Sequence, residues 1–241
     1  NPFIGCTNLT AITVDEANQA FISIDGVLYS VGDFYNALVC YPGGKLGASY
    51  TVPDEVSYIE DYAFTGTVNL ETVYISENMA NVDSYSFWNS SIKNIFVDEN
   101  NMYYSDVDGV LYTYNQEMII YYPAARTESS YTLAENVKII GYKAFQNAKN
   151  LTSIVLNQGL TQIYSYGFSG SGITSIIIPI SIYYIGDSIF FECESLTELN
   201  FEAASLNGIN TAYYWNLLGY DQNGETIRIN DDIIHYDYSG D

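Results

Sequence analysis

Apolar residues recur along this chain at fixed spacings. A branched aliphatic residue is followed five positions later by phenylalanine in five places: Ile59 to Phe64, Val82 to Phe87, Ile140 to Phe145, Ile163 to Phe168, and Ile185 to Phe190. Uninterrupted units repeat every 23 residues, as from Phe64 to Phe87. A period of this length is typical of proteins built from stacked structural repeats.

A second apolar pattern follows each phenylalanine after five or six residues, as a trio with offsets 0, 3 and 5. The last two members lie two residues apart, so they share one face of a β-strand while the residue between them points to the other face. Phe3 heads a sixth, truncated unit, because Leu9 follows it at the spacing that separates Leu70 from Phe64. The trios are Leu9, Ile12, Val14; Leu70, Val73, Ile75; Ile92, Ile95, Val97; Leu151, Ile154, Leu156; Ile173, Ile176, Ile178; and Leu196, Leu199, Phe201.

A single unit cannot bury its own apolar face, so neighbouring units must stack on one another. Parallel strands about 4.8 Å apart would place Ile75 over Val97. The phenylalanines would form a second ladder inside the coil. A charge at Phe87 or Phe145 should therefore break the stack locally.

Two longer gaps between phenylalanines hold inserts that resemble each other. Asp25-Gly26-Val27-Leu28-Tyr29 recurs as Asp108-Gly109-Val110-Leu111-Tyr112, and Tyr41-Pro42 recurs as Tyr122-Pro123. Asp-Gly before β-prone residues predicts a β-hairpin or a pair of extra strands. In the second insert we expect strands over residues 110–114 and 118–122, joined around Asn115. The chain thus carries a super-repeat of about 81 residues.

The repeats define the expected domain organisation. Residues 1–201 form one solenoid of six units, with inserts at about 15–50 and 98–131. Residues 202–241 lose the period and are expected to form a C-terminal cap, to which residues 226–229 add an edge strand. The chain starts inside a repeat, so we expect a further N-terminal unit or cap in the full-length protein.

Residues 185–199 combine Ile185, Phe190, Cys193, Leu196 and Leu199 in a pattern that resembles the BspA-like leucine-rich-repeat family. Residues 5–12 carry its second half, and the resemblance covers roughly residues 3–201. It implies a right-handed leucine-rich-repeat solenoid, a β-dominated α/β superhelix with parallel strands on the concave face and β-hairpin inserts. It also implies a surface or secreted location, commonly in host-associated microbes, and several members of the family are implicated in adhesion. Most repeats here have another small or polar residue at the cysteine position, so a specific ligand does not transfer.

Charge and cysteine content narrow the functional classes. Seven Lys and Arg against 29 Asp and Glu give a formal net charge of −22, which disfavours nucleic acid and anionic lipid as partners. The longest aliphatic runs are far shorter than the ~20 residues of a membrane helix. Cys6, Cys40 and Cys193 form no CxxC pair and predict neither a disulfide framework nor a zinc site.

Catalytic and metal-binding patterns are sparse, so we expect no enzyme activity, no cofactor and no bound metal. His235 is the only histidine, so a histidine-dependent triad would have to include it. Acidic clusters at 98–99, 106–109 and 221–225 raise the alternative of Ca²⁺, but none has a full EF-hand pattern. Asp and Asn before Gly are more simply turn formers.

The candidate binding site comes from the residues between the last two core positions of each trio. If the strands stack in order, Tyr74, Phe96, Val155 and Ile177 form a contiguous exposed apolar row on the concave sheet. Such patches can mark interaction sites. Alternatively, these β-prone residues simply suit strands, or an insert covers them.

These features favour an extracellular or cell-surface protein-binding module, with adhesion to host or matrix proteins as its specific role. The abundant tyrosines offer contact surface for proteins and, less favourably, glycans. A structural spacer within a larger surface protein is the alternative. A glycan-active protein is a more distant one.

Overall fold

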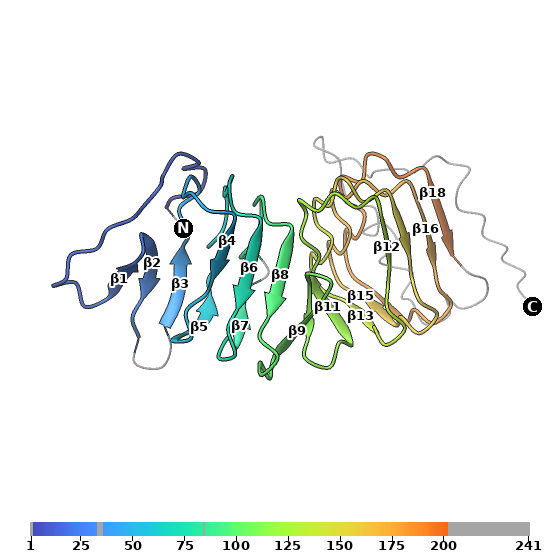
Figure 1. The fold of residues 1–241 in the computed structure, drawn as a ribbon. Helices are drawn as coiled ribbons and strands as arrows, with labels where there is room; N and C mark the ends of the chain where they lie inside the picture. The colour runs from blue at the N-terminus through green and yellow to red at the C-terminus, as the bar shows by residue number, and fades with distance from the viewer. Residues whose placement is uncertain (1, 33–35, 84, 202–241) are drawn as a thin grey trace, which may run out of the picture. The chain divides into compact units, whose positions relative to one another are not determined.

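The computed structural model describes residues 2–32, 36–83 and 85–201 (Figure 1). Contacts divide the chain into two compact units, Asn1–Arg126 and Thr127–Asp241. Short β-strands and tight turns build both units, and the described residues contain no α-helix. The solenoid of parallel strands is confirmed, without a helical component in this part of the chain.

The first unit contains eleven strands within its described residues. They are β1 (Phe21–Ile24), β2 (Val27–Ser30), β3 (Asn36–Cys40), β4 (Ser49–Thr51), β5 (Val56–Ile59), β6 (Thr72–Ile75), β7 (Asn81–Val82), β8 (Asn94–Val97), β9 (Tyr104–Val107), β10 (Val110–Thr113) and β11 (Met118–Tyr121). They form a sheet of order β1-β2-β3-β5-β7, a sheet β4-β6-β8, and the antiparallel set β9-β10-β11.

The second unit repeats the two-sheet plan. Its described strands are β12 (Ser130–Thr132), β13 (Ile139–Ile140), β14 (Ser153–Val155), β15 (Gln162–Ile163), β16 (Ser175–Ile178), β17 (Tyr184–Ile185) and β18 (Glu198–Phe201). One sheet has the order β12-β14-β16-β18, and β13, β15 and β17 pair in parallel beside one another. Each turn of the solenoid therefore contributes one strand to each of two sheets.

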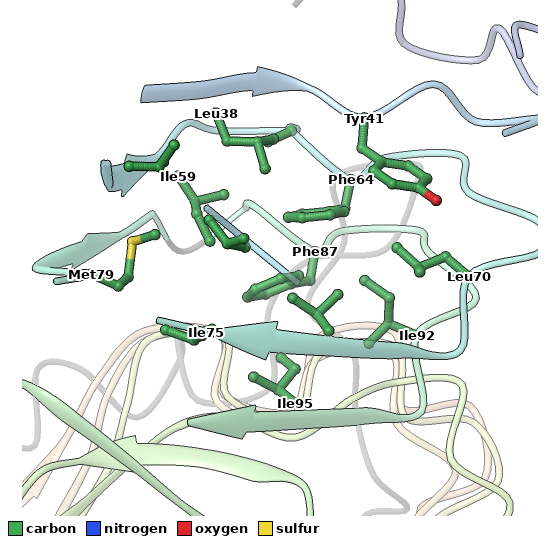
Figure 2. Packing of buried hydrophobic residues seen from close by; sticks show 14 of the residues in the cluster. Leu38, Tyr41, Ile59, Phe64, Leu70, Ile75, Met79, Phe87, Ile92 and Ile95 are labelled. Carbon is green, nitrogen blue, oxygen red and sulfur yellow. The ribbon is translucent and has the colours of Figure 1, made fainter. Parts of the chain in front are cut away.

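The predicted strand register and phenylalanine ladder are both confirmed. Ile75 pairs with Val97, and the inward residues Val73 and Ile95 are fully buried. Phe64 and Phe87 stack with ring centroids 5.4 Å apart (Figure 2). In the second unit the stack includes Phe145, Phe168 and Phe190, with successive centroids 5.2 Å and 5.7 Å apart. The ladder forms because equivalent residues of a fixed-period repeat are superposed by strand pairing.

A tyrosine extends this ladder into the first insert. The Tyr41 ring is buried and stacks on Phe64 at 5.6 Å, and the Tyr41 N–H donates to the Ala63 carbonyl. Tyr50 pairs with Val73, so β4 takes the place of a trio strand. The insert therefore contains a complete solenoid turn, β3 with β4, which a count of phenylalanines alone misses.

The Asp-Gly signals form turns, as predicted, but each turn also closes a hairpin with a strand that precedes it. Asp25 and Asp108 have φ of 48° and 52°, and each is followed by a glycine of positive φ. β1 pairs with β2, and β9 with β10, across these turns. β10 and β11 match the expected strand pair, whereas β1 and β9 were not predicted. Polar residues such as Ser105 interrupt any apolar alternation in β9, so only pairing with β10 reveals it as a strand.

Each hairpin is hydrogen-bonded to a trio segment, which for the second hairpin is strand β8. The first trio, Leu9, Ile12 and Val14, is half-buried and forms no strand, contrary to the expectation. The N–H of Ile95 donates to Gly109 O at 2.9 Å, and that of Ile12 to Gly26 O at 2.8 Å. A basic side chain also reaches each Asp-Gly turn: Lys45 Nζ donates to Asp25 O and Arg126 Nη1 to Asp108 O, both at 2.6 Å. The two inserts therefore repeat not only in sequence but also in the tertiary contacts of their Asp-Gly turns.

Candidate binding surfaces

The outer face of the β4-β6-β8 sheet carries the first pair of predicted site residues. Tyr74 and Phe96 are cross-strand partners, and their rings stack at 5.6 Å with an interplanar angle of 29°. The Tyr74 side chain is exposed, at 43%, whereas Phe96 is half-buried. The hairpin lies against the β8 edge, because Ile95 is bonded to Gly109 and Val97 to the Asp106 carboxylate. Phe96 thus contributes less open surface than the sequence pattern implies.

The outer face of the β12-β14-β16-β18 sheet carries the second pair. Val155 and Ile177 are 58% and 54% exposed, while the preceding strand residues Ile154 and Ile176 are buried. Ser153 pairs with Ser175, which places Val155 and Ile177 beside each other two residues further along the strands. This pair is an open apolar surface on rigid, paired backbone.

The expected contiguous row of all four residues is wrong. Tyr74 and Phe96 belong to one sheet, and Val155 and Ile177 to another. The neighbour of Val155 on β12 is Thr132, which the trio pattern did not include. The second insert supplies β12 as an extra strand beside β14. The strands of the trios therefore do not form one row that holds both apolar pairs.

Polar residues flank both apolar pairs. On the first sheet the outer positions beside them are Ser49, Thr72 and Asn94, which lie in register with one another. On the second sheet the corresponding register positions are Ser130, Ser153, Ser175 and Glu198. An apolar centre beside hydroxyl and amide groups is the usual anatomy of a protein interface.

Six of the abundant tyrosines, which stand in adjacent pairs in the sequence, are candidates for contact surface: Tyr103, Tyr104, Tyr121, Tyr122, Tyr213 and Tyr214. Tyr121 and Tyr122 are buried and Tyr104 is half-buried, so they are structural. Tyr103 is 56% exposed. Tyr213 and Tyr214 lie outside the described residues. Exposure thus selects Tyr103, which sequence reasoning could not distinguish from its neighbours.

A match to a protein-family model shows which family this chain belongs to. The model of the BspA type leucine-rich repeat region matches residues 45–108 and 121–233, in six copies. The chain belongs to the BspA type leucine-rich-repeat family.

Solved structures of other leucine-rich-repeat proteins are similar to this chain. A leucine-rich-repeat protein from Eubacterium ventriosum is 26% identical, with a TM-score of 0.56 over 67% of this chain and 50% of that one. A leucine-rich cell surface protein from Faecalibacterium prausnitzii is 18% identical, with a TM-score of 0.49 over 79% and 57%. The pneumococcal vaccine antigen PcpA is also 18% identical, with a TM-score of 0.49 over 66% and 51%. This leucine-rich-repeat chain spans about half the length of these structures. The comparison with curated proteins gives no match.

Two acidic side chains of this leucine-rich-repeat protein, in the clusters considered for Ca²⁺, accept backbone N–H groups. Asp98 Oδ1 accepts the Asn100 N–H at 2.9 Å, and Asp106 Oδ1 accepts the Val97 N–H at 2.8 Å. No group of three or more His, Cys, Asp or Glu side chains in the described residues could hold a metal ion. The acidic cluster at 221–225 and His235 lie outside the described residues.

The three cysteines occupy different environments, and none of them forms a disulfide. Cys6 is exposed, Cys40 is buried, and Cys193 is half-buried. Burial raises the pKa of the Cys193 thiol, which lies 3.0 Å from the Phe168 carbonyl oxygen. A raised pKa lowers the thiolate fraction and hence the reactivity of this group. The described part of the chain also has no helix with the length and apolar character needed to span a bilayer.

Proposed function

We propose that this chain is a non-enzymatic, protein-binding module at the cell surface or outside the cell, with adhesion to host or matrix proteins as its specific role. Membership of the BspA type leucine-rich-repeat family supports a role in protein interaction or as a scaffold. The name of the Faecalibacterium prausnitzii protein places that relative at the cell surface. Location and partner are proposals for this chain.

The observation that carries the proposal is the exposed Val155–Ile177 pair. Both side chains are more than half exposed on neighbouring strands whose inward residues are buried. Leaving such residues in water gives no folding stability, whereas covering them would contribute about 25 cal/mol for each Å² of apolar area. Tyr74 and Phe96 form a second, separate apolar pair on the β4-β6-β8 sheet of the first unit.

The test uses the intact chain and an array of purified extracellular-matrix proteins and glycans. The double variant Val155→Ser, Ile177→Ser removes the apolar centre of the β12-β14-β16-β18 face without touching the buried residues. We expect its binding to the proteins that the wild type recognises to fall about tenfold or more, because a few central apolar residues dominate interface energies.

The matched control is Ile180→Ser, which removes an isoleucine of similar exposure, 50%, from the turn after β16. This variant should bind as the wild type does. Equal binding by the double variant would refute this site. Failure of the wild type to bind any arrayed protein would favour the structural-spacer role instead.

A further inference from the structure

Three large, exposed side chains occupy the open end of the β9–β10 hairpin, opposite its Asp-Gly turn. Met102 is 79% exposed, Tyr103 56% and Tyr114 60%. Tyr114 N–H donates to Tyr103 O at 2.9 Å, which continues the pairing of Thr113 with Tyr104. Directly opposed residues of an antiparallel pair project to the same side. We call Met102, Tyr103 and Tyr114 the hairpin patch.

The backbone under the hairpin patch is fixed by the buried Asn101. Its Nδ2 donates to Ser76 O at 2.8 Å and to Met79 O at 2.9 Å. Its Oδ1 accepts the N–H groups of Tyr103 and Tyr104, both at 2.8 Å. The patch is therefore held in place before any partner arrives, which lowers the entropy cost of binding.

The first hairpin serves as an internal comparison, because its residues lie 83 positions earlier in the sequence. Asn18 Oδ1 accepts the N–H groups of Ala20 and Phe21, and Val31 N–H donates to Ala20 O at 2.9 Å. These bonds match those around Asn101. In place of Met102, Tyr103 and Tyr114, this hairpin has Gln19, Ala20 and Val31. The same backbone thus forms with smaller or polar side chains, so folding does not require the patch.

The residues that flank the hairpin patch in the sequence carry negative charge and no positive charge. We call Asp98, Glu99 and Glu117 its acidic rim. Asp98, Glu99 and Glu117 are all exposed, and residues 94–125 include no Lys or Arg. Tyrosine and methionine are enriched at protein interfaces, where charged residues form the rim. An acidic rim around an apolar centre complements a partner of the opposite charge.

We infer that the hairpin patch is a docking site for a protein segment whose apolar side chains are flanked by Lys or Arg. This inference rests on the proposed role in protein binding and adds a second site with a defined partner chemistry. The apolar contacts supply affinity, while the acidic rim selects basic partners and speeds their association.

The experiment exchanges the side chains of the two hairpins in the intact chain. The loss variant Met102→Gln, Tyr103→Ala, Tyr114→Val gives the second hairpin the residues of the first. The gain variant Gln19→Met, Ala20→Tyr, Val31→Tyr does the reverse. The probes are synthetic peptides of alternating leucine, tryptophan and serine, flanked by runs of lysine, serine or glutamate. Affinity is measured by fluorescence anisotropy at low and at physiological salt.

We expect the lysine-flanked peptide to bind the wild type most tightly and to lose about tenfold or more in affinity with the loss variant. The gain variant, which keeps the natural patch, should bind a second equivalent of peptide. Circular dichroism and thermal unfolding confirm that both variants fold. Equal affinity of wild type and loss variant, or a preference for the glutamate-flanked peptide, would overturn the inference.

The Val155→Ser, Ile177→Ser variant distinguishes the two proposals. It should bind the lysine-flanked peptide as the wild type does. If it loses that binding while the loss variant keeps it, the hairpin site is wrong and the sheet face remains supported. If no lysine-flanked peptide binds the wild type, the hairpin inference fails, whatever the matrix array shows.

Discussion

Glycine at the turns between stacked strands permits successive backbones to approach closely. A Cβ added at Gly172 would overlap the backbone oxygen of Lys149, one turn earlier, and one at Gly186 would overlap the Ser165 amide nitrogen. Because these neighbours are backbone atoms, they cannot rotate away as a side chain can. At these positions glycine is required because adjacent turns of the solenoid lie close together, and not because of a positive φ.

Gly172→Ala should therefore destabilise the second unit by about 2–3 kcal/mol, the cost of forcing backbone shifts in a well-packed interior. The control is Gly159→Ala, whose added Cβ would meet the mobile end of the Lys138 side chain, at 3.1 Å. It should change the free energy of unfolding by less than about 1 kcal/mol. Urea unfolding followed by circular dichroism measures both, and equal costs would contradict the argument.

Buried tyrosines give the protein a predictable response to alkaline pH. Burial raises the pKa of Tyr121 to about 12, and its hydroxyl donates to Phe87 O at 3.1 Å. A raised pKa means that the folded state favours the neutral phenol. Its contribution to stability is therefore complete below the unfolded pKa of about 10 and is lost as pH rises toward 12.

The variant Tyr121→Phe should lose about 1 kcal/mol at pH 7, where one hydrogen bond disappears. Between pH 9 and 11.5, its stability should fall by about 2 kcal/mol less than that of the wild type. Denaturant titrations across this range measure the difference, with Tyr103→Phe as the control for loss of a surface hydroxyl. Parallel pH profiles for wild type and Tyr121→Phe would disprove the assignment.

At the scale of elements, each hairpin is attached to the solenoid at its Asp-Gly turn. Arg126 is buried and donates to Asp108 O at 2.6 Å, while its Nη2 lies 3.5 Å from the exposed Asp108 carboxylate. Lys45 makes the same two contacts with Asp25. The hydrogen bond from Arg126 to the Asp108 backbone oxygen is shielded from solvent. It should therefore contribute more to stability than the ion pair, which solvent screens.

We expect Arg126→Ala to destabilise the hairpin by about 2 kcal/mol, through loss of a charged hydrogen bond and of packing. Hydrogen exchange at the Ile95 amide, which is bonded to Gly109 O, reports the loosening directly. Asp108→Asn keeps the carbonyl and tolerates the positive φ, so it should cost less than about 0.5 kcal/mol. A larger effect from Asp108→Asn than from Arg126→Ala would show that the ion pair dominates.

At the scale of the whole molecule, excess negative charge opposes the compact state. The formal net charge is −22, and the seven basic residues are too few to pair with 29 acidic ones. Like charges brought together by folding repel, and added salt screens this repulsion. The chain should therefore become more stable as ionic strength rises.

Raising NaCl from 0.01 M to 0.5 M at pH 7 should increase Tm by about 3 °C or more, the shift that roughly 1 kcal/mol produces in a chain of this size. Differential scanning calorimetry measures the change. KCl should act equally, because screening does not depend on the cation. Near pH 4, where carboxylates are partly protonated, the salt effect should shrink. A lower Tm in salt at pH 7 would contradict this account.

The sequence by itself determined the repeating plan of the fold. Equivalent residues of a regular repeat must superpose, so the spacing of Phe64 and Phe87 predicts their stacking and that of Ile75 and Val97 predicts their pairing. The Asp25-Gly26 and Asp108-Gly109 turns could also be predicted, because their positive φ is a local property of the residues. These features depend on neighbours along the chain or one period away.

Only the tertiary structure decided which outward residues are open to a partner. Phe96 and Ile177 occupy the same position of the repeat, yet a hairpin lies against β8 and leaves Phe96 half-buried, while Ile177 is open. Tyr41 joins the ring ladder because strand pairing superposes it on Phe64, although its hydroxyl hides it from an apolar pattern. Exposure depends on what packs alongside from other parts of the chain, and no local spacing encodes that.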